Sequence, residues 1–207
     1  IFTDQANATA DITAKELVIS GISVQSKVYD GNTNATVSGS AQITGGAATF
    51  SDGLFYTGDS VNIVGAVSVA NFASKNVGIQ SVTGLTGLSL DGIDRANYRL
   101  ASLSGTAAIT AKAITVSGIT AANKVYDGVT AATVNTSGAS GWLANDMVTV
   151  ASTGVFDDKN VGTGKTVSLT SSYSGTDAGN YIFTDQANAT AAITAKAITV
   201  SGITAAN

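Results

Sequence analysis

The sequence predicts an all-β protein made of tandem antiparallel β-sandwich units, and three observations support this prediction. First, one stretch recurs: residues 10–31 match 107–128, and 192–207 begin the same sequence a third time. Self-similarity of this kind is typical of tandem repeats in which each repeat is one structural unit. Second, apolar and polar residues alternate with a period of two. Third, the chain is rich in Thr, Val and Gly and has no Pro, which favours short strands and Gly-rich turns over helices.

Three motifs occur in the same order in both repeats and fix their phase. They are Lys-Val-Tyr-Asp-Gly (27–31 and 124–128), Phe-x-x-Lys-Asn-Val-Gly (72–78 and 156–162) and Asp-x-x-Asn-Tyr (94–98 and 177–181). Ile12, Ile109 and Ile193 are equivalent, so the first spacing is 97 residues and the second is 84.

The phase of the repeats predicts the domain organisation. We expect a first repeat over 15–111 and a second over 112–195. Residues 1–14 are expected to be the closing strand of a preceding repeat, and 196–207 the opening strand of a following one. The chain is therefore expected to be a segment of a longer array.

The first repeat is longer than the second, and most of the extra residues fall at 38–56 when Gly58-Asp59 is matched to Asn145-Asp146. Gly45-Gly46 and Asp52-Gly53 are turn signals on either side of an apolar stretch. We therefore predict that this insertion is an added hairpin or a long loop at one end of the first unit.

Alternating residues predict which side chains are buried in each strand. Ile114, Val116 and Gly118 are expected to face one way, and Thr115 and Ser117 the other. Leu17, Ile19 and Gly21 repeat this pattern in the first copy. Further strands are predicted at 60–64, 66–72, 79–90, 97–101 and 104–110, with counterparts at 147–151, 153–157, 165–173, 180–184 and 189–195. Six to eight short strands per unit without helical stretches predict an immunoglobulin-like β-sandwich.

Composition excludes several classes of function. The chain has no Cys and no His, so it has no disulfide, no thiol nucleophile and no imidazole for acid–base catalysis or metal binding. Charged residues make up only 12% and the net charge is −4, which argues against a nucleic-acid partner. No apolar run approaches the length of a membrane span. We expect no enzyme activity, no cofactor and no metal site.

The Lys-Val-Tyr-Asp-Gly motif is expected to end a strand in a structural corner. Gly supplies a positive φ, Asp can accept a hydrogen bond from a backbone N–H two residues on, and Tyr can bury its ring. The alternative is a spontaneous isopeptide bond, which needs a desolvated Lys beside an amide and a buried acid. Its candidate groups are the amines of Lys27 and Lys124, the amides of Asn76 and Asn160, and the acids of Asp30 and Asp127.

The remaining motifs are first interpreted as structural. A Tyr near a strand start, as in Asp-x-x-Asn-Tyr, resembles the corner-forming tyrosine of immunoglobulin-like sandwiches. Two acidic pairs lack the alternating spacing of a calcium loop and are expected to form solvated turns. They are Asp91 with Asp94, and Asp157 with Asp158.

Four aromatic residues lie where the repeats differ most, and they are the candidate ligand contacts. Phe50, Phe55 and Tyr56 belong to the insertion or follow it, and Trp142 occupies the position that matches Phe55. Such residues can stack on a sugar ring, or they can pack over an open end of a sheet. Both interpretations are retained.

The order of the motifs resembles the YDG repeat of large bacterial surface proteins. The motifs are Lys-Val-Tyr-Asp-Gly followed by Thr33 or Thr130, then Lys-Asn-Val-Gly, then Asp-Ala-Gly-Asn-Tyr at 177–181, and then Thr-Ala-Lys-Ala-Ile-Thr-Val. That repeat is similar to the mostly bacterial immunoglobulin-like modules of filamentous-haemagglutinin-type exoproteins and adhesins. The first repeat departs from the pattern at Arg95, where a small residue is usual. The resemblance implies repeats in a long secreted or surface-anchored chain and implies no catalytic residue.

From this we expect a structural segment of a bacterial cell-surface or secreted adhesin or fibre, acting in cell adhesion as a stalk or as a filament building block. The expected partners are neighbouring repeats or copies of the same protein, with surface glycans as a further possibility. The alternative is a glycan- or protein-binding module that uses the insertion of the first unit.

Overall fold

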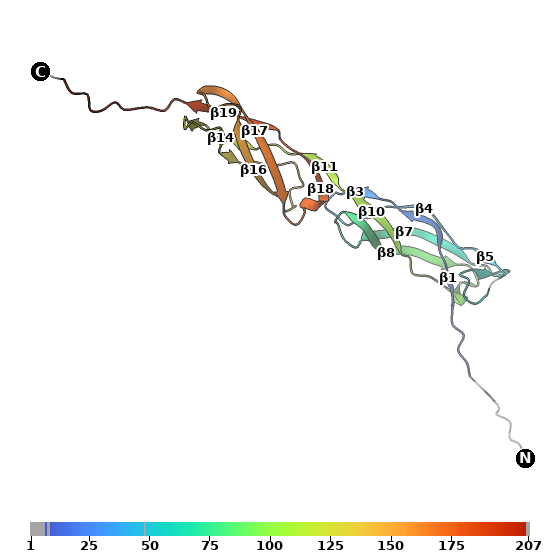
Figure 1. Cartoon of the computed structure of the whole chain (residues 1–207). Coiled ribbons are helices and arrows are strands. Elements are labelled where there is room, and N and C mark those ends of the chain that lie inside the picture. The colour runs from blue at the N-terminus through green and yellow to red at the C-terminus, as the bar shows by residue number, and fades with distance from the viewer. Residues whose placement is uncertain (1–6, 8, 48, 206–207) are drawn as a thin grey trace, which may run out of the picture. The chain divides into compact units, whose positions relative to one another are not determined.

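The computed structural model describes residues 7, 9–47 and 49–205 and divides into two compact units (Figure 1). Unit 1 comprises the described part of Ile1–Lys27 together with Asn32–Ile109. Unit 2 comprises Val28–Gly31 together with the described part of Thr110–Asn207. The short segment Val28–Gly31, which follows directly on Lys27, thus folds as part of the second unit.

Unit 1 is organised around a four-stranded sheet with the order β3-β10-β8-β7, in which β8 pairs antiparallel with both β7 and β10. Smaller pairs are β2 with β4 (antiparallel), β1 with β9 (parallel) and β5 with β6 (parallel). The strands are β1 (Lys15–Leu17), β2 (Ser20–Val24), β3 (Lys27–Val28), β4 (Val37–Gln42), β5 (Gly45–Gly46), β6 (Phe55–Tyr56), β7 (Asn62–Phe72), β8 (Gly78–Asp91), β9 (Tyr98–Leu100) and β10 (Gly105–Thr110).

Unit 2 has the same plan in a five-stranded sheet with the order β13-β19-β17-β16-β14, accompanied by the parallel pair β11 with β18 and the antiparallel pair β12 with β15. The strands are β11 (Lys112–Thr115), β12 (Thr120–Ala121), β13 (Lys124–Val125), β14 (Ala131–Ala132), β15 (Val134–Asn135), β16 (Thr149–Phe156), β17 (Gly162–Ser174), β18 (Tyr181–Thr184) and β19 (Asn188–Thr194). A single 3-10 turn precedes β9 and another precedes β18: η1 (Arg95–Asn97) and η2 (Ala178–Asn180).

The all-β prediction is confirmed, because the described residues contain strands and two 3-10 turns and no α-helix. The immunoglobulin-like arrangement of the sheets stays a prediction. The strands expected at 60–64 and 66–72 are one strand, β7, in which Gly65 still pairs with Leu88 and the register to β8 shifts between Gly65 and Val69. Those expected at 147–151 and 153–157 are likewise one strand, β16, which pairs with β17 without a break.

The predicted alternation of buried and exposed side chains is confirmed from Ile114 to Ser117 and fails beyond it, because Gly118 is exposed and Ile119 is buried. Ile114 and Val116 are buried while Thr115 and Ser117 are exposed, and Leu17 is fully buried in unit 1. In unit 2 the core also contains Ile119, Phe156, Val167, Leu169, Ala191 and Ile193. In unit 1 the residues Leu17, Val61 and Tyr98 form a core cluster with Ile43, Phe55 and Leu90 packed against it.

Of the two forms predicted for the insertion at 38–56, the structure contradicts the hairpin, and the long loop stays a prediction. Gly45-Gly46 is not a turn but strand β5, which pairs in parallel with β6, and β4 pairs with β2 rather than with a partner inside the insertion. The segment is therefore not a self-contained hairpin. Asp52-Gly53 does lie in a turn, and the buried Gly53 accepts a hydrogen bond from Val18 N at 3.0 Å. Backbone bonds of this kind fix the insertion to the body of unit 1.

The strands expected at the two ends of the sequence are not present in the described residues 9–14 and 196–205. Residues 1–6, 8 and 206–207 lie outside the described part of the chain. Ile12 is fully exposed, whereas its equivalents Ile109 and Ile193 are buried. A lone strand leaves its backbone groups and its apolar face in water, so the same sequence forms a strand only beside a partner.

Candidate functional site

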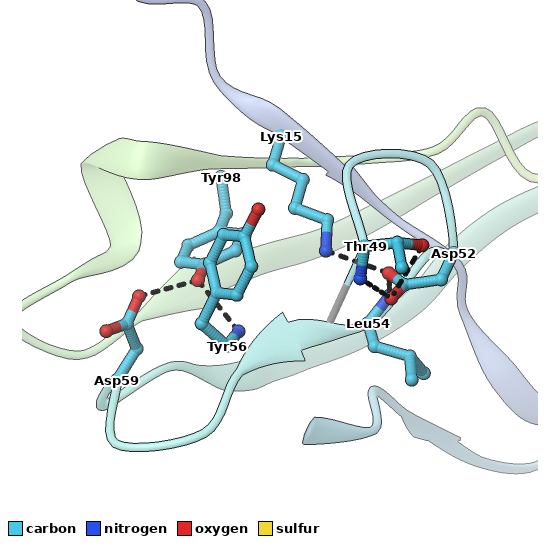
Figure 2. A network of polar contacts seen from close by, with 7 residues as sticks. All are labelled: Lys15, Thr49, Asp52, Leu54, Tyr56, Asp59 and Tyr98. Carbon is cyan, nitrogen blue, oxygen red and sulfur yellow. Dashed lines mark hydrogen bonds and ion pairs between the residues drawn. The ribbon is translucent and has the colours of Figure 1, made fainter. Parts of the chain in front are cut away.

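Tyr98 is the centre of a polar cluster in unit 1 (Figure 2). It is the first residue of β9, and its ring is buried. Its hydroxyl donates to Asp59 Oδ2 at 2.5 Å and accepts a hydrogen bond from Tyr56 N at 2.9 Å. We call Tyr56, Asp59 and Tyr98 the cradle of unit 1.

Backbone contacts hold the cradle in place. Asp59 N donates to Tyr56 O at 3.1 Å, which closes a tight turn between two cradle residues. Asp94, the first residue of the Asp-x-x-Asn-Tyr motif, accepts Ser60 N on its Oδ2 at 2.8 Å. The Asp-x-x-Asn-Tyr motif therefore contributes to the cradle twice. Its last residue is Tyr98 itself, and the carboxylate of its first residue, Asp94, holds Ser60, which follows Asp59.

Unit 2 contains the same cradle, made of Leu143, Asp146 and Tyr181. Tyr181 begins β18, donates to Asp146 Oδ2 at 2.5 Å and accepts Leu143 N at 3.1 Å. Asp146 N donates to Leu143 O at 3.0 Å. Asp177 Oδ2 accepts Met147 N at 2.9 Å, as Asp94 accepts Ser60 N in unit 1. Both tyrosines are buried and begin a strand, as expected, but their hydroxyls bond to residues far away in the sequence, so the likeness to the corner-forming tyrosine of immunoglobulin-like sandwiches stays a prediction.

A second tyrosine fills the cradle of unit 2. Tyr29, from the segment Val28–Gly31, is only 1% exposed and donates its hydroxyl to Asp146 Oδ2 at 2.8 Å. Its ring meets the ring of Tyr181 edge to face, with centroids 5.4 Å apart. The carboxylate of Asp146 therefore accepts hydrogen bonds from two phenol groups, and Tyr29 N is held in turn by Thr110 O at 2.8 Å.

The cradle of unit 1 instead opens into a pocket of about 530 Å³. Phe50, at its rim, is 79% exposed, and Ile12 and Tyr56 also line it. Lys15 Nζ lies 4.3 Å from the centroid of the Tyr56 ring and 2.8 Å from Asp52 Oδ1 (Figure 2). The pocket thus combines exposed aromatic surface with two carboxylates, those of Asp11 and Asp59.

Burial and hydrogen bonding shift the acid–base behaviour of these groups. Burial, and then the hydrogen bond to Asp59, raises the pKa of Tyr98. The same two causes, with Asp146 as the acceptor, raise the pKa of Tyr181 to about 12. The hydrogen bond from Lys15, followed by that from Leu54 N, lowers the pKa of Asp52 to about 2. Both tyrosines therefore remain hydrogen-bond donors at neutral pH, and none of these groups has a pKa near 7 for acid–base catalysis.

Comparison with known families gives two matches along the chain, at residues 13–106 and 110–189, both to the YDG domain. The chain belongs to the YDG domain family. A search of curated proteins and a search of solved structures found no match. The two YDG matches together cover most of the chain, and the segment Val28–Gly31 lies within the first match although it folds with unit 2.

The motif that gives the YDG domain its letters forms a corner, as predicted from the sequence. Gly31 and Gly128 have φ of 80° and 85°, a region that favours glycine. Asp127 Oδ1 accepts Val129 N at 3.1 Å, two residues on. Lys124 Nζ donates to Asp127 Oδ1, Val129 O and Ala131 O, at 2.8, 2.7 and 3.0 Å.

Lys124 is one of the candidate amines for an isopeptide bond. Its Nζ donates three hydrogen bonds in these contacts, which is the number that a charged ammonium group can donate. Lys27 Nζ donates to the backbone O and Oδ1 of Asn32, at 2.8 and 3.0 Å. The backbone N–H groups of Asn76 and Asn160 bond to Ser74 Oγ and to Asp158 Oδ1. These contacts favour the interpretation of the motifs as turns, and the isopeptide bond, with Asp30 and Asp127 as its acids, stays a hypothesis.

The four aromatic candidates separate into two pairs. Phe55 packs against the core of unit 1, and Trp142 packs at the equivalent place in unit 2. Phe50 and Tyr56 are exposed and line the pocket. Packing thus accounts for Phe55 and Trp142, whereas Phe50 and Tyr56 remain available for a ligand.

Asp91 is the last residue of β8 and Asp94 lies in the turn that follows, whereas Asp157 and Asp158 lie in the bend after β16. Lys165 Nζ bridges Asp157 Oδ1 and Asp158 Oδ1 at 3.0 and 2.8 Å, and Arg95 lies 3.5 Å from Asp91. Within the described residues no group of three or more acidic side chains could hold a metal ion. In the same part of the chain, no helix is long and apolar enough to cross a membrane.

The sequence analysis missed the cradle as a cluster. Its signal was present, because Asp59 and Asp146 occupy matched positions in the two repeats and each repeat carries an Asp-x-x-Asn-Tyr motif. What the sequence did not show is that the Tyr of Lys-Val-Tyr-Asp-Gly reaches the Asp of the other repeat, as Tyr29 reaches Asp146 over 117 residues.

Proposed function

We propose that this chain is a structural segment of a long bacterial cell-surface or secreted adhesin or fibre of the filamentous-haemagglutinin type, in which YDG repeats form a stalk or filament. Tyr29 is the single observation that carries the proposal. It lies in the first YDG match, and it is a buried core residue of unit 2. A repeat that supplies a core residue to the next unit in the sequence works as part of an array.

The polar chemistry of the chain also supports a mechanical rather than a catalytic role. The matched carboxylates Asp59, Asp94, Asp146 and Asp177 bind backbone N–H groups or tyrosine hydroxyls. Catalysis by a chain without His or Cys would need a pair of free carboxylates. The role we propose is passive: hydrogen-bonded β-units in series carry load and place other parts of the protein at a distance.

Single-molecule force spectroscopy tests the proposal directly. Each unit has about 100 residues, so stretching the chain between its ends should give two unfolding events. Each event should release about 350 Å of chain, at roughly 3.5 Å per residue. Extension without any force peak, as a flexible linker shows, would contradict a load-bearing role.

The variant Tyr29→Phe identifies which event belongs to unit 2. It should lower the unfolding force of one event and leave the other unchanged, because its hydroxyl donates to Asp146 of unit 2. The exposed substitution Val64→Ala in unit 1 serves as the control and should change neither force.

A second candidate function, binding of a glycan or a protein, is favoured by one observation. Phe50 is 79% exposed beside the pocket of unit 1, and exposed aromatic rings in hollows are suited to stacking on sugars. A glycan array should then give a signal that Phe50→Ala abolishes and that Ile79→Ala, at an equally exposed position in the same unit, preserves. No signal with the native chain would count against this alternative.

A further inference from the structure

We propose that the cradle of unit 1 is a docking site for a Tyr-Asp-Gly corner, and that its occupant is Tyr126-Asp127-Gly128 of a second copy of this chain. The inference deepens the proposed array function and rests on it. It assigns a partner to the pocket at Asp59 and Tyr98, and it makes association head-to-tail, because the corner belongs to the second repeat and the cradle to the first.

The first step is that the two cradles have the same geometry. In both, a tyrosine hydroxyl donates to a carboxylate Oδ2 at 2.5 Å, in the pairs Tyr98 with Asp59 and Tyr181 with Asp146. In both, that hydroxyl accepts a backbone N–H from the residue three positions before the aspartate. The acceptor site that Tyr29 uses on Asp146 therefore has an equivalent on Asp59.

The second step is that unit 2 shows what this geometry binds. Tyr29 enters edge to face on Tyr181, and its hydroxyl reaches Asp146. Gly31, two residues on, lies so close to Leu143 that an added Cβ would stand 3.0 Å from Leu143 Cδ1. The cradle therefore contacts both the Tyr and the Gly of the corner, which together define a recognition element.

The third step is that the cradle of unit 1 has room for such a corner. Its pocket of about 530 Å³ is larger than a tyrosine side chain, and Asp59 is only partly buried there. Phe50 and Tyr56 add aromatic surface that Leu143 does not supply in unit 2. An incoming tyrosine ring would meet Tyr98 edge on and cover part of Phe50, which removes apolar surface from water.

The fourth step is that Tyr126 is presented in the same way as Tyr29. Tyr126 N donates to Thr194 O at 2.8 Å, as Tyr29 N donates to Thr110 O at 2.8 Å. Gly128 has nearly the same φ as Gly31. Tyr126 is only partly buried, and in the described part of the chain its hydroxyl has no hydrogen-bond partner.

A contact between Tyr126 of one copy and the cradle of the next joins two different surfaces of the chain. Interfaces of this heterologous kind propagate without closing. The pocket at Asp59 and the corner at Tyr126 are therefore the two complementary faces of one linear contact.

Photo-cross-linking on the full chain tests the pairing. Tyr126→p-benzoylphenylalanine is mixed, at millimolar concentration, with the native chain labelled with ¹⁵N. The expected product is a mixed-label dimer whose cross-linked peptide comes from residues 54–60 or 95–100. The same cross-linker at Ile182, an exposed residue of unit 2, should give no such product. Absence of mixed-label dimers, or attachment to another surface, overturns the proposal.

Sedimentation velocity on variants provides the quantitative test. Tyr126→Phe removes the donor of the predicted hydrogen bond, and Asp59→Asn replaces its charged acceptor with a neutral amide; each change should weaken self-association about tenfold. The control Asp91→Asn makes the same charge change at an exposed ion pair of unit 1 and should leave self-association unchanged.

Loss of glycan binding, without any change in self-association, in Asp59→Asn would assign the pocket to a sugar and overturn the proposal. A chain that stays monomeric at millimolar concentration would do the same. In both cases the two mechanical unfolding events would still be expected, so the stalk function is tested separately.

Discussion

Replacing Tyr29 by Phe should destabilise unit 2 although the residue follows directly on unit 1 in the sequence. The change removes one hydroxyl and keeps the ring, so the edge-to-face contact with Tyr181 is preserved. What is lost is the 2.8 Å hydrogen bond to Asp146 Oδ2. Because the acceptor is a carboxylate in a buried site, the free energy of unfolding of unit 2 should fall by about 1.5–3 kcal/mol.

The single tryptophan provides the assay. Trp142 is the only Trp of the chain, and it packs against the core of unit 2. Its fluorescence therefore follows the unfolding of unit 2 without a contribution from unit 1. With an m-value of about 1.5 kcal/mol/M, the urea midpoint seen by Trp142 should fall by roughly 1–2 M in Tyr29→Phe.

The chain supplies its own matched control. Tyr126 occupies the same position in the second Lys-Val-Tyr-Asp-Gly motif, and its hydroxyl has no partner among the described residues. Tyr126→Phe should shift the midpoint in the monomer by an amount within error, about 0.5 kcal/mol or less. Equal shifts for the two variants, or an unchanged Trp142 transition in Tyr29→Phe, would refute the role assigned to the cradle.

Three further predictions concern the groups around the cradles. Because the pKa of Tyr181 is raised to about 12 from an ordinary value of 10, its contribution to stability should be complete below pH 10 and lost as the pH rises towards 12. Trp142 fluorescence should show this slope, and Tyr181→Phe should reduce it to the part that Tyr173 contributes, since burial and the hydrogen bond to Asp185 raise the pKa of Tyr173 to about 12 as well. Because the pKa of Asp52 is lowered to about 2, its contribution should be complete above about pH 4 and lost as the pH falls to 2; hydrogen exchange of unit 1 should report the loss, and Asp52→Asn should abolish that pH dependence. Gly175→Ala should destabilise unit 2 by about 1–3 kcal/mol, since φ at Gly175 is 116° and the new Cβ would lie 2.2 Å from Met147 O. The control Gly179→Ala, with open space around the new Cβ, should be nearly neutral when both variants are unfolded in urea.

The features that the sequence could predict are those set by local pattern. Alternation placed Ile114 and Val116 inside and Thr115 outside, because the side chains of a strand point to opposite faces in turn. The Asp-x-x-Asn-Tyr motif predicted a tyrosine at a strand start, and Tyr98 and Tyr181 are the first residues of β9 and β18. Both features depend on a few consecutive residues, which a single sequence displays.

The features that it could not predict depend on contacts between distant residues. Nothing near Tyr29 indicates that its hydroxyl bonds to Asp146. In the insertion, Gly45-Gly46 is a strong turn signal by composition, yet it forms a strand because β6 lies beside it. Pairing with another segment thus overrode the local preference of two glycines.

An identical sequence in two places shows how far pairing decides the structure of this chain. Residues 107–123 and 191–207 have the same sequence. The first few residues are strand in both copies, in β10 and β19. Beyond them, 112–115 form β11 beside β18, whereas 196–205 form no strand and expose their side chains. Since local propensity is equal in the two copies, the difference comes from the partner strand alone: the opening segment of a YDG repeat takes its structure from the strand that follows the Asp-x-x-Asn-Tyr corner. The cradle tyrosine is the first residue of that strand, so the residue that binds the Tyr-Asp-Gly corner also begins the strand on which the opening segment of the same repeat pairs.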